Sequence, residues 1–121
     1  MTLEARIAAT LDSLAPLLRD VATKIHTHPE LRFEEHRAAA WLTEAVEARG
    51  LAVERGTGGL ATAFRARAGK PGPRIAILAE YDALPEIGHA CGHNLIAAGA
   101  LGAFLALAAH ADELGGTVEL L

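Results

Sequence analysis

Apolar residues recur every three or four positions over the first part of the chain. The series comprises Leu3, Ile7, Leu11, Leu14, Leu18, Val21 and Ile25. This spacing predicts one long amphipathic helix with a single buried face. Thr2 is a suitable N-cap. Pro29 disfavours helical geometry at His28, so we expect the helix to end between Ile25 and Thr27.

The middle of the chain changes from helical spacing to short apolar runs. A second helix is predicted from about Phe33 to Arg49, because Gly50 supplies a C-terminal stop. The segment Gly56–Gly59 is interpreted as a hairpin turn rather than a phosphate-binding loop, since the residues after it alternate like a strand and do not open a helix. Strands are expected at Leu51–Arg55, Leu60–Arg67, Arg74–Ala79 and Thr117–Leu121.

The segment Arg74–Ala79 has apolar residues at both alternating sets of positions, which predicts a central strand covered on both faces. A third helix is expected from about Asn94 to Leu114, with small residues that permit close approach to a sheet. Together these elements predict an α/β fold, with helices packed on a mixed β-sheet, in one domain spanning residues 1–121.

Composition and charge exclude several classes of function. The net charge of −4 is spread over both signs, which argues against a nucleic-acid partner. The apolar run Leu95–Ala109 is shorter than the roughly 18 residues of a membrane span, so we expect a buried helix and no membrane contact. No signal-like segment opens the chain, which predicts a cytoplasmic location. A single cysteine excludes an intramolecular disulfide.

The candidate chemistry is concentrated between the third predicted strand and the third helix. Residues 79–94 contain three carboxylates, two imidazoles and Cys91, the only cysteine of the chain. Ligands bind outside the carboxyl ends of strands in open α/β sheets, and this connection starts at such an end. Because one glycine separates Cys91 from His93, an extended backbone would point both side chains the same way.

A thiolate and an imidazole suit zinc and similar metals. Asp82, at the exit of the strand, could bind the metal or orient a ligand histidine. Two other interpretations remain open at this stage: Cys91 as a small buried hydrophobe, and Cys91 as a nucleophile activated by His93 or His89. We expect Glu34 and Glu35 to favour the start of the second helix rather than to act in catalysis.

Two motifs carry a resemblance to a known family. Glu80–Pro85 (EYDALP) and Gly88–Ala97 (GHACGHNLIA) resemble the signature of the co-catalytic metallopeptidase family of aminoacylases and amidohydrolases. They are most similar to its branch of aminobenzoyl-glutamate hydrolases and β-alanyl-lysine dipeptidases. The segment His26–Leu31 (HTHPEL), with Phe33 and Glu35, also resembles that family.

The resemblance implies roles for particular residues. Cys91 and His93 would be ligands of a divalent metal, zinc or in some members manganese, and Asp82 a carboxylate beside the metal. Glu80 occupies the position where more distant relatives place a metal-binding histidine. The substrate would be a small amide, an N-acyl amino acid or a dipeptide-like compound, and complete members would form homodimers.

The resemblance also implies that the chain is the N-terminal part of a catalytic domain. In the family, a pair of adjacent glutamates supplies the base and a further ligand shortly after the strand that begins here at Thr117. We therefore expect the chain to bind metal weakly and to show negligible turnover. Two alternatives stay open: a non-catalytic fragment that acts as an interaction module, and a cysteine-dependent enzyme that uses Cys91.

Overall fold

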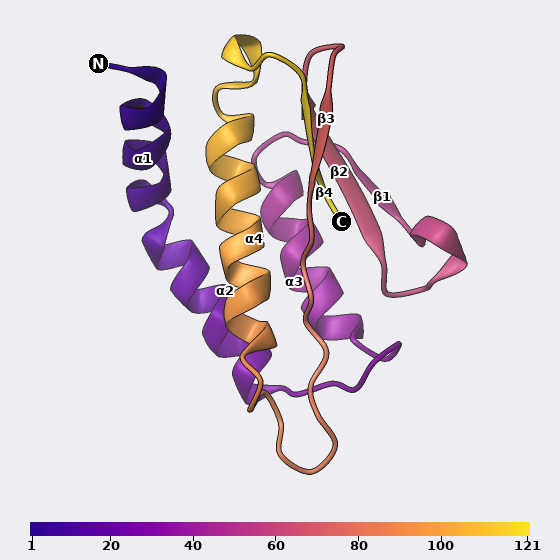
Figure 1. Ribbon diagram of the computed structural model, residues 1–121. Helices are drawn as coiled ribbons and strands as arrows, with labels where there is room; N and C mark the ends of the chain where they lie inside the picture. Colours follow the sequence, from indigo (N-terminus) through magenta and orange to yellow (C-terminus); the bar gives the residue numbers. More distant parts are fainter.

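A four-stranded mixed sheet with four helices on one side organises the chain in the computed structural model, which describes residues 1–121 (Figure 1). The predicted α/β fold is therefore confirmed. The helices are α1 (Leu3–Ser13), α2 (Ala15–Thr27), α3 (His36–Glu47) and α4 (His93–Ala108). The strands are β1 (Val53–Arg55), β2 (Phe64–Gly69), β3 (Arg74–Ile77) and β4 (Thr117–Leu120). Two short 3₁₀ turns, η1 (Thr57–Gly59) and η2 (Ala111–Glu113), complete the set.

The sheet has the strand order β1-β2-β4-β3. Strands β1 and β2 form the predicted hairpin around Gly56–Gly59, although β2 begins only at Phe64 rather than at Leu60. Strand β4 pairs antiparallel with β2 and parallel with β3, so that Leu120 lies opposite both Ala66 and Ile77. The last strand in sequence is thus inserted between two earlier ones.

The prediction that Arg74–Ala79 forms a central, covered strand is wrong. Strand β3 lies at the edge of the sheet, with Ile75 68% exposed and Leu78, just past its end, 63% exposed. The central position belongs to β4, whose Val118 and Leu120 are buried. An apolar run reveals that a segment suits a strand, but it carries no information about which neighbour that strand will have.

The single long helix predicted for the N-terminus is interrupted. Helix α1 ends at Ser13, and Pro16 lies in the first turn of α2. Proline lacks an N–H group and its ring clashes with the carbonyl four residues earlier, so an unbroken helix cannot pass through Pro16. Leu14, at the junction, is nevertheless 1% exposed. Both helices pack against α4, but of the predicted apolar face only Leu14, Val21 and Ile25 are buried, and α1 has no buried residue.

Helix α4 lies between the sheet and helices α1 and α2, and α3 packs beside it on β1 and β2 (Figure 1). Leu101, Phe104 and Leu105 are buried on it, and each such side chain contributes about 1.5–3 kcal/mol on removal from water. The helix ends at Ala108, earlier than predicted, and the rest of the predicted helix is replaced by η2. No helix of the structure is both long and apolar enough to cross a membrane.

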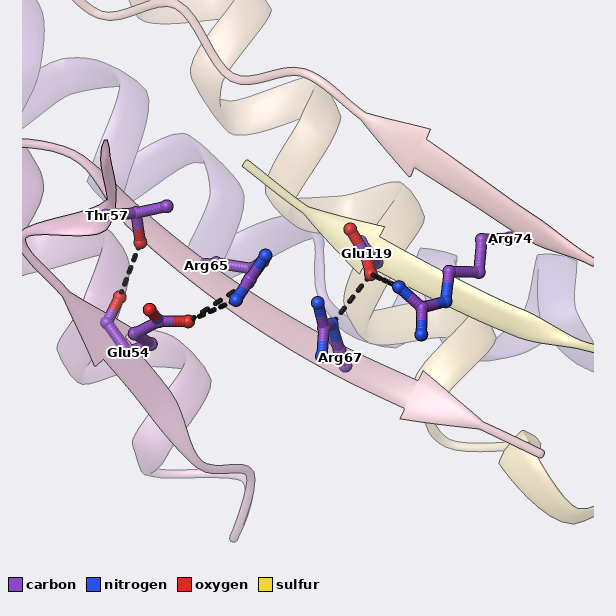
Figure 2. A network of polar contacts seen from close by, with 6 residues as sticks. All are labelled: Glu54, Thr57, Arg65, Arg67, Arg74 and Glu119. Atoms are coloured by element: carbon purple, nitrogen blue, oxygen red, sulfur yellow. Dashed lines mark hydrogen bonds and ion pairs between the residues drawn. The ribbon is translucent and has the colours of Figure 1, made fainter. Parts of the chain in front are cut away.

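The face of the sheet turned away from the helices is polar (Figure 2). Arg65 on β2 pairs with Glu54 on β1 at 2.7 Å, and Arg67 on β2 pairs with Glu119 on β4 at 2.7 Å. Arg74 on β3 lies 3.8 Å from the same Glu119 carboxylate. These contacts link side chains of all four strands. They explain how Glu119 can be buried on a central strand, because its charge is paired.

We expect two glycines of α4 to respond differently to alanine. Gly99 is exposed and a Cβ there would meet nothing within 4 Å, so Gly99→Ala should raise the free energy of unfolding by about 0.5–1 kcal/mol. A Cβ on Gly102 would lie 2.6 Å from Leu18 Cδ1 on α2 and 3.1 Å from Leu11 Cδ1 on α1. Gly102→Ala should therefore not be stabilised, and its free energy of unfolding should be about 1 kcal/mol or more below that of Gly99→Ala. Urea denaturation of both variants measures the difference, and equal stabilities would contradict the packing of α4 on α1 and α2.

Candidate functional site

The candidate site lies on the long connection from β3 to α4, at the carboxyl ends of the parallel strands β3 and β4 (Figure 1). The connection is held in place by backbone hydrogen bonds. Ala79 N–H donates to Leu121 O at 2.7 Å, which extends the pairing of the two strands beyond β3. Ala83 N–H donates to Glu30 O at 2.7 Å, which ties the connection to the loop between α2 and α3.

That neighbouring loop also fixes the start of α3. The Glu30 carboxylate accepts hydrogen bonds from the N–H groups of Arg37 and Ala38, at 2.9–3.0 Å. Glu30 therefore neutralises the helix N-terminus from outside the helix. The prediction gave this task to Glu34 and Glu35. Glu35 does lie at the start of the helix, as its N-cap residue, but its side chain makes no capping hydrogen bond because it bonds Phe33 N–H and Thr62 Oγ1 instead.

His93, the first residue of α4, is oriented by Asp82. Its Nδ1 lies 2.8 Å from Asp82 Oδ1 and 3.0 Å from the Asp82 carbonyl oxygen. Both partners are acceptors, so Nδ1 carries a ring proton, and a metal could bind only at Nε2. A carboxylate that holds the far nitrogen of a histidine in this way is the usual support of a metal-binding imidazole. Asp82 thus contacts a histidine side chain, which fits one of the two roles that the sequence left open for it.

Glu80 faces the free nitrogen of the same ring. Its Oε2 lies 3.4 Å from His93 Nε2. Two ligands of one tetrahedral zinc, each at about 2.0–2.1 Å from the metal, lie about 3.3 Å apart. The separation of these two atoms therefore suits shared coordination of a cation. Sequence reasoning named Glu80 but gave it no role, because its contact with His93 appears only in three dimensions.

Cys91 is a free, exposed thiol. The argument that an extended backbone would align it with His93 is wrong, since Gly92 between them has φ 87° and ψ 22° and caps α4. The segment turns at this glycine, which tolerates the left-handed conformation. The exposure of Cys91 also excludes the interpretation of this residue as a buried hydrophobe. No group of three or more His, Cys, Asp or Glu side chains is arranged to enclose a metal ion.

His89 is buried, and neither ring nitrogen has a hydrogen-bond partner. Burial lowers the pKa of His89 below its usual value, and the neighbouring His26 and His93 lower it further. A buried imidazole without partners is costly to charge, so His89 is neutral at physiological pH. Neither His89 nor His93 makes a hydrogen bond to the Cys91 thiol. The geometry therefore gives no support to a cysteine nucleophile activated by either histidine.

A buried polar network next to Asp82 was missed by sequence reasoning. The Glu35 carboxylate accepts hydrogen bonds from Phe33 N–H at 2.7 Å and from Thr62 Oγ1 at 2.5 Å. The Tyr81 hydroxyl donates to the Thr62 carbonyl oxygen. The network joins the loop before α3, the segment before β2 and the connection that follows β3. No local sequence pattern could have revealed it, because Thr62 lies 27 residues after Glu35 and 19 residues before Tyr81.

Comparison with known proteins identifies relatives of this chain. No protein-family model matches the sequence. The chain is 43% identical to the Xaa-Arg dipeptidase of Mus musculus, over 93% of its own length and 28% of that protein. It is 39% identical to one of the subunits of the p-aminobenzoyl-glutamate hydrolase of Escherichia coli, over 83% of its own length and 25% of that protein.

Solved structures give the same result. The YxeP protein of Bacillus subtilis, described as a dinuclear metal-binding peptidase from the M20 family, matches with a TM-score of 0.80 and 28% identity. The match covers 90% of this chain and 35% of that one. An aminobenzoyl-glutamate utilization protein from Klebsiella pneumoniae shares the fold, with a TM-score of 0.72 and 19% identity over 95% of this chain and 37% of that one.

The relatives named above are peptidases and amidohydrolases, and this chain is similar to them in sequence and in fold. The chain spans about a quarter to a third of the length of the curated relatives it matches. One of the similar structures is described as an M20 peptidase, and the likeness to these relatives supports the resemblance carried by the EYDALP and GHACGHN motifs.

Tyr81 provides a spectroscopic test of the buried network. Burial, followed by the nearby charge of Glu35, raises the pKa of Tyr81 from 10.0 to about 12. The folded state therefore retains the phenol proton more strongly than the unfolded state does, so this contribution to stability is complete below pH 10 and is lost as the pH rises toward 12. Because Tyr81 is the only tyrosine, tyrosinate absorbance should titrate near 12 in the folded chain and near 10 in urea.

Tyr81→Phe serves as the control for this titration. It should remove the added loss of stability between pH 10 and 12, while it also loses the hydrogen bond to the Thr62 carbonyl oxygen. A tyrosinate midpoint near 10 in the folded chain would contradict the burial of the phenol.

Proposed function

We propose that this chain is part of the catalytic domain of a metal-dependent amidohydrolase. Its substrates would be small amides: N-acyl amino acids or dipeptide-like compounds. The observation that supports this most directly is the contact of Asp82 with His93 Nδ1, which leaves Nε2 free beside the Glu80 carboxylate. The names of the relatives, a dipeptidase and a p-aminobenzoyl-glutamate hydrolase, support the substrate class.

Each residue of the site has a separate task in this proposal. His93 Nε2 and the Cys91 thiolate would hold the metal, which we propose to be zinc, with manganese as the alternative. Because the donors do not enclose an ion in this structure, the exposed Cys91 would have to turn toward it. Glu80 supplies a further oxygen donor on the same side as Nε2. Asp82 keeps the proton on Nδ1 and so fixes the tautomer that can bind a metal. When bound, the metal supplies polarisation of the amide carbonyl and a lowered pKa for its bound water.

The same proposal assigns residues 1–121 to one portion of a catalytic domain in a cytoplasmic protein. A reducing compartment keeps a single exposed thiol such as Cys91 unoxidised and available to a metal. Because the chain spans about a quarter to a third of its relatives, we expect it to bind zinc without hydrolysing N-acyl amino acids at a measurable rate.

A second candidate function is self-association, as expected for a homodimer or an interaction module. Strand β3 is an edge strand with Ile75 exposed. A groove of about 290 Å³ runs beside it, lined in part by Leu107 and Leu114. Exposed strand edges with apolar neighbours readily pair with other chains.

Zinc binding tests the proposed metal site. Calorimetric titration of the chain should show one site, and Cys91→Ser or His93→Ala should each weaken its zinc affinity by at least about tenfold. Asp82→Asn should weaken the affinity by about tenfold, because the amide no longer favours a proton on Nδ1. His36→Ala, at an exposed histidine that also begins a helix, is the matched control and should leave the affinity unchanged. Equal zinc affinity for wild type and His93→Ala would refute the proposed site.

Sedimentation equilibrium tests the second candidate. If β3 mediates association, the mass of the chain should rise with concentration, and Ile75→Lys should restore a monomer, since a charged side chain on an edge strand opposes pairing. Leu60→Lys, at an exposed leucine away from β3, should have no such effect. A monomer at all concentrations would eliminate this candidate.

A further inference from the structure

A basic pocket opens on the polar face of the sheet, at the amino ends of β3 and β4. The candidate metal site lies at the opposite, carboxyl ends of the same two strands. The pocket has a volume of about 500 Å³, and its walls include Arg67 near the end of β2, Lys70 in the turn after β2, Arg74 and Thr117. No acidic side chain lines it.

Strand register brings these side chains to one face of the sheet. Arg67 on β2 lies opposite Glu119 on β4, and Arg74 on β3 lies opposite Thr117 on β4. Residues that face each other on neighbouring strands project from the same side of a sheet, and so do residues two apart on one strand. Figure 2 accordingly shows Arg67 and Arg74 on either side of the Glu119 carboxylate.

Glu119 neutralises only part of the positive charge at the pocket. Its Oε1 accepts a hydrogen bond from Arg67 Nε at 2.7 Å, whereas Arg74 Nη1 lies 3.8 Å from the same oxygen, beyond hydrogen-bond distance. The terminal nitrogens of Arg67, the guanidinium of Arg74 and the ammonium of Lys70 make no hydrogen bond within the chain. Three cations thus share one carboxylate, in a chain whose net charge is −4.

The turn that carries Lys70 is fixed against the turn that precedes β4. Lys70 N–H donates to Gly116 O at 3.0 Å, and Thr117 Oγ1 donates to Lys70 O at 2.8 Å. A Cβ on Gly69 would overlap the carbonyl oxygen of Gly116, so the two turns pack backbone against backbone. The backbone of the pocket is therefore formed before any ligand arrives, which lowers the entropic cost of binding.

The charges of the pocket indicate the chemistry of its ligand. A guanidinium donates two parallel hydrogen bonds to an oxyanion, and an ammonium adds a compact positive charge. A phosphate group concentrates up to about two negative charges and several acceptor oxygens, which suits three cations better than the single charge of a carboxylate. No aromatic side chain lines the pocket, so nothing there can stack on a base or another ring.

We infer that Arg67, Lys70 and Arg74 form a binding site for the phosphate groups of a small phosphorylated compound. Glu119 acts as a positioning residue, since it holds the Arg67 guanidinium through Nε and leaves both terminal nitrogens free. The carboxylate of Glu119 also competes with the ligand for the same cations. The site is separate from the candidate metal site and needs no zinc.

Titration of the 121-residue chain with sodium diphosphate, followed by amide NMR shifts at constant ionic strength, tests the site. The shifts should centre on Lys70, Gly72 and Thr117, and diphosphate should bind at least about fivefold more tightly than inorganic phosphate because it carries more charge. ADP should bind within about twofold of diphosphate, since its base finds no aromatic partner.

Variants of the two exposed cations separate the site from general charge effects. Arg74→Gln and Lys70→Gln should each weaken diphosphate binding by at least about threefold, because each removes one charged donor. Arg19→Gln is the matched control, since Arg19 is an exposed arginine on α2 without an ion pair, on the other side of the sheet. It removes the same charge and should leave the affinity unchanged.

Glu119→Gln should change the affinity in the opposite direction. Glutamine keeps an acceptor for Arg67 Nε but removes the competing charge, so diphosphate should bind at least about threefold more tightly. Equal affinities of the wild type, Arg74→Gln and Lys70→Gln, or no binding of diphosphate at millimolar concentration, would overturn the inference. Vesicles of phosphatidylcholine and phosphatidic acid should not sediment the chain, and sedimentation that Lys70→Gln abolishes would assign the site to a lipid surface instead.

Discussion

The burial of α4 is the constraint on which the rest of the structure depends. This helix is apolar around most of its circumference, so it must be enclosed, and α1, α2, α3 and the sheet together enclose it. Its N-terminus is fixed by the buried Asn94, whose Nδ2 donates to the carbonyl oxygen of Ala22 on α2 at 3.3 Å. His93 lies one residue before that anchor. Packing of the core therefore determines where the candidate metal-binding ring stands.

The second requirement is that the end of β3 reaches that ring. Parallel pairing of β3 with β4 directs the chain toward the N-terminus of α4, and the tie from Ala83 to Glu30 holds the connection there. Asp82 can then contact His93 Nδ1 with both its carbonyl and its carboxylate oxygen. A rigid helix supplies the imidazole, and an irregular segment supplies the carboxylates. This division is common because loops carry chemistry that regular elements position.

Sequence reasoning found the elements that local physics dictates and missed those set by distant contacts. The α/β class, the hairpin, the start of α4 and the family follow from periodicity, turn residues and two motifs. The break at Pro16 was visible in the sequence but was outweighed by an uninterrupted apolar spacing. The edge position of β3 was not visible, because it depends on where β4 inserts. The Asp82 pairing was predicted from chemistry, whereas Glu80 and the Glu35 network required the fold.

Two kinds of exposed hydrophobic residue can be separated by backbone geometry. Ile75, Leu78 and Leu95 are exposed at a sheet edge, a strand exit and a helix surface, and none of them has a positive φ. These side chains are exposed because no other element of the chain covers them. Phe33 is equally exposed, but its conformation costs free energy that the buried Glu35 carboxylate offsets through one hydrogen bond. An exposed side chain that the fold maintains against strain is better explained by a ligand than by missing packing.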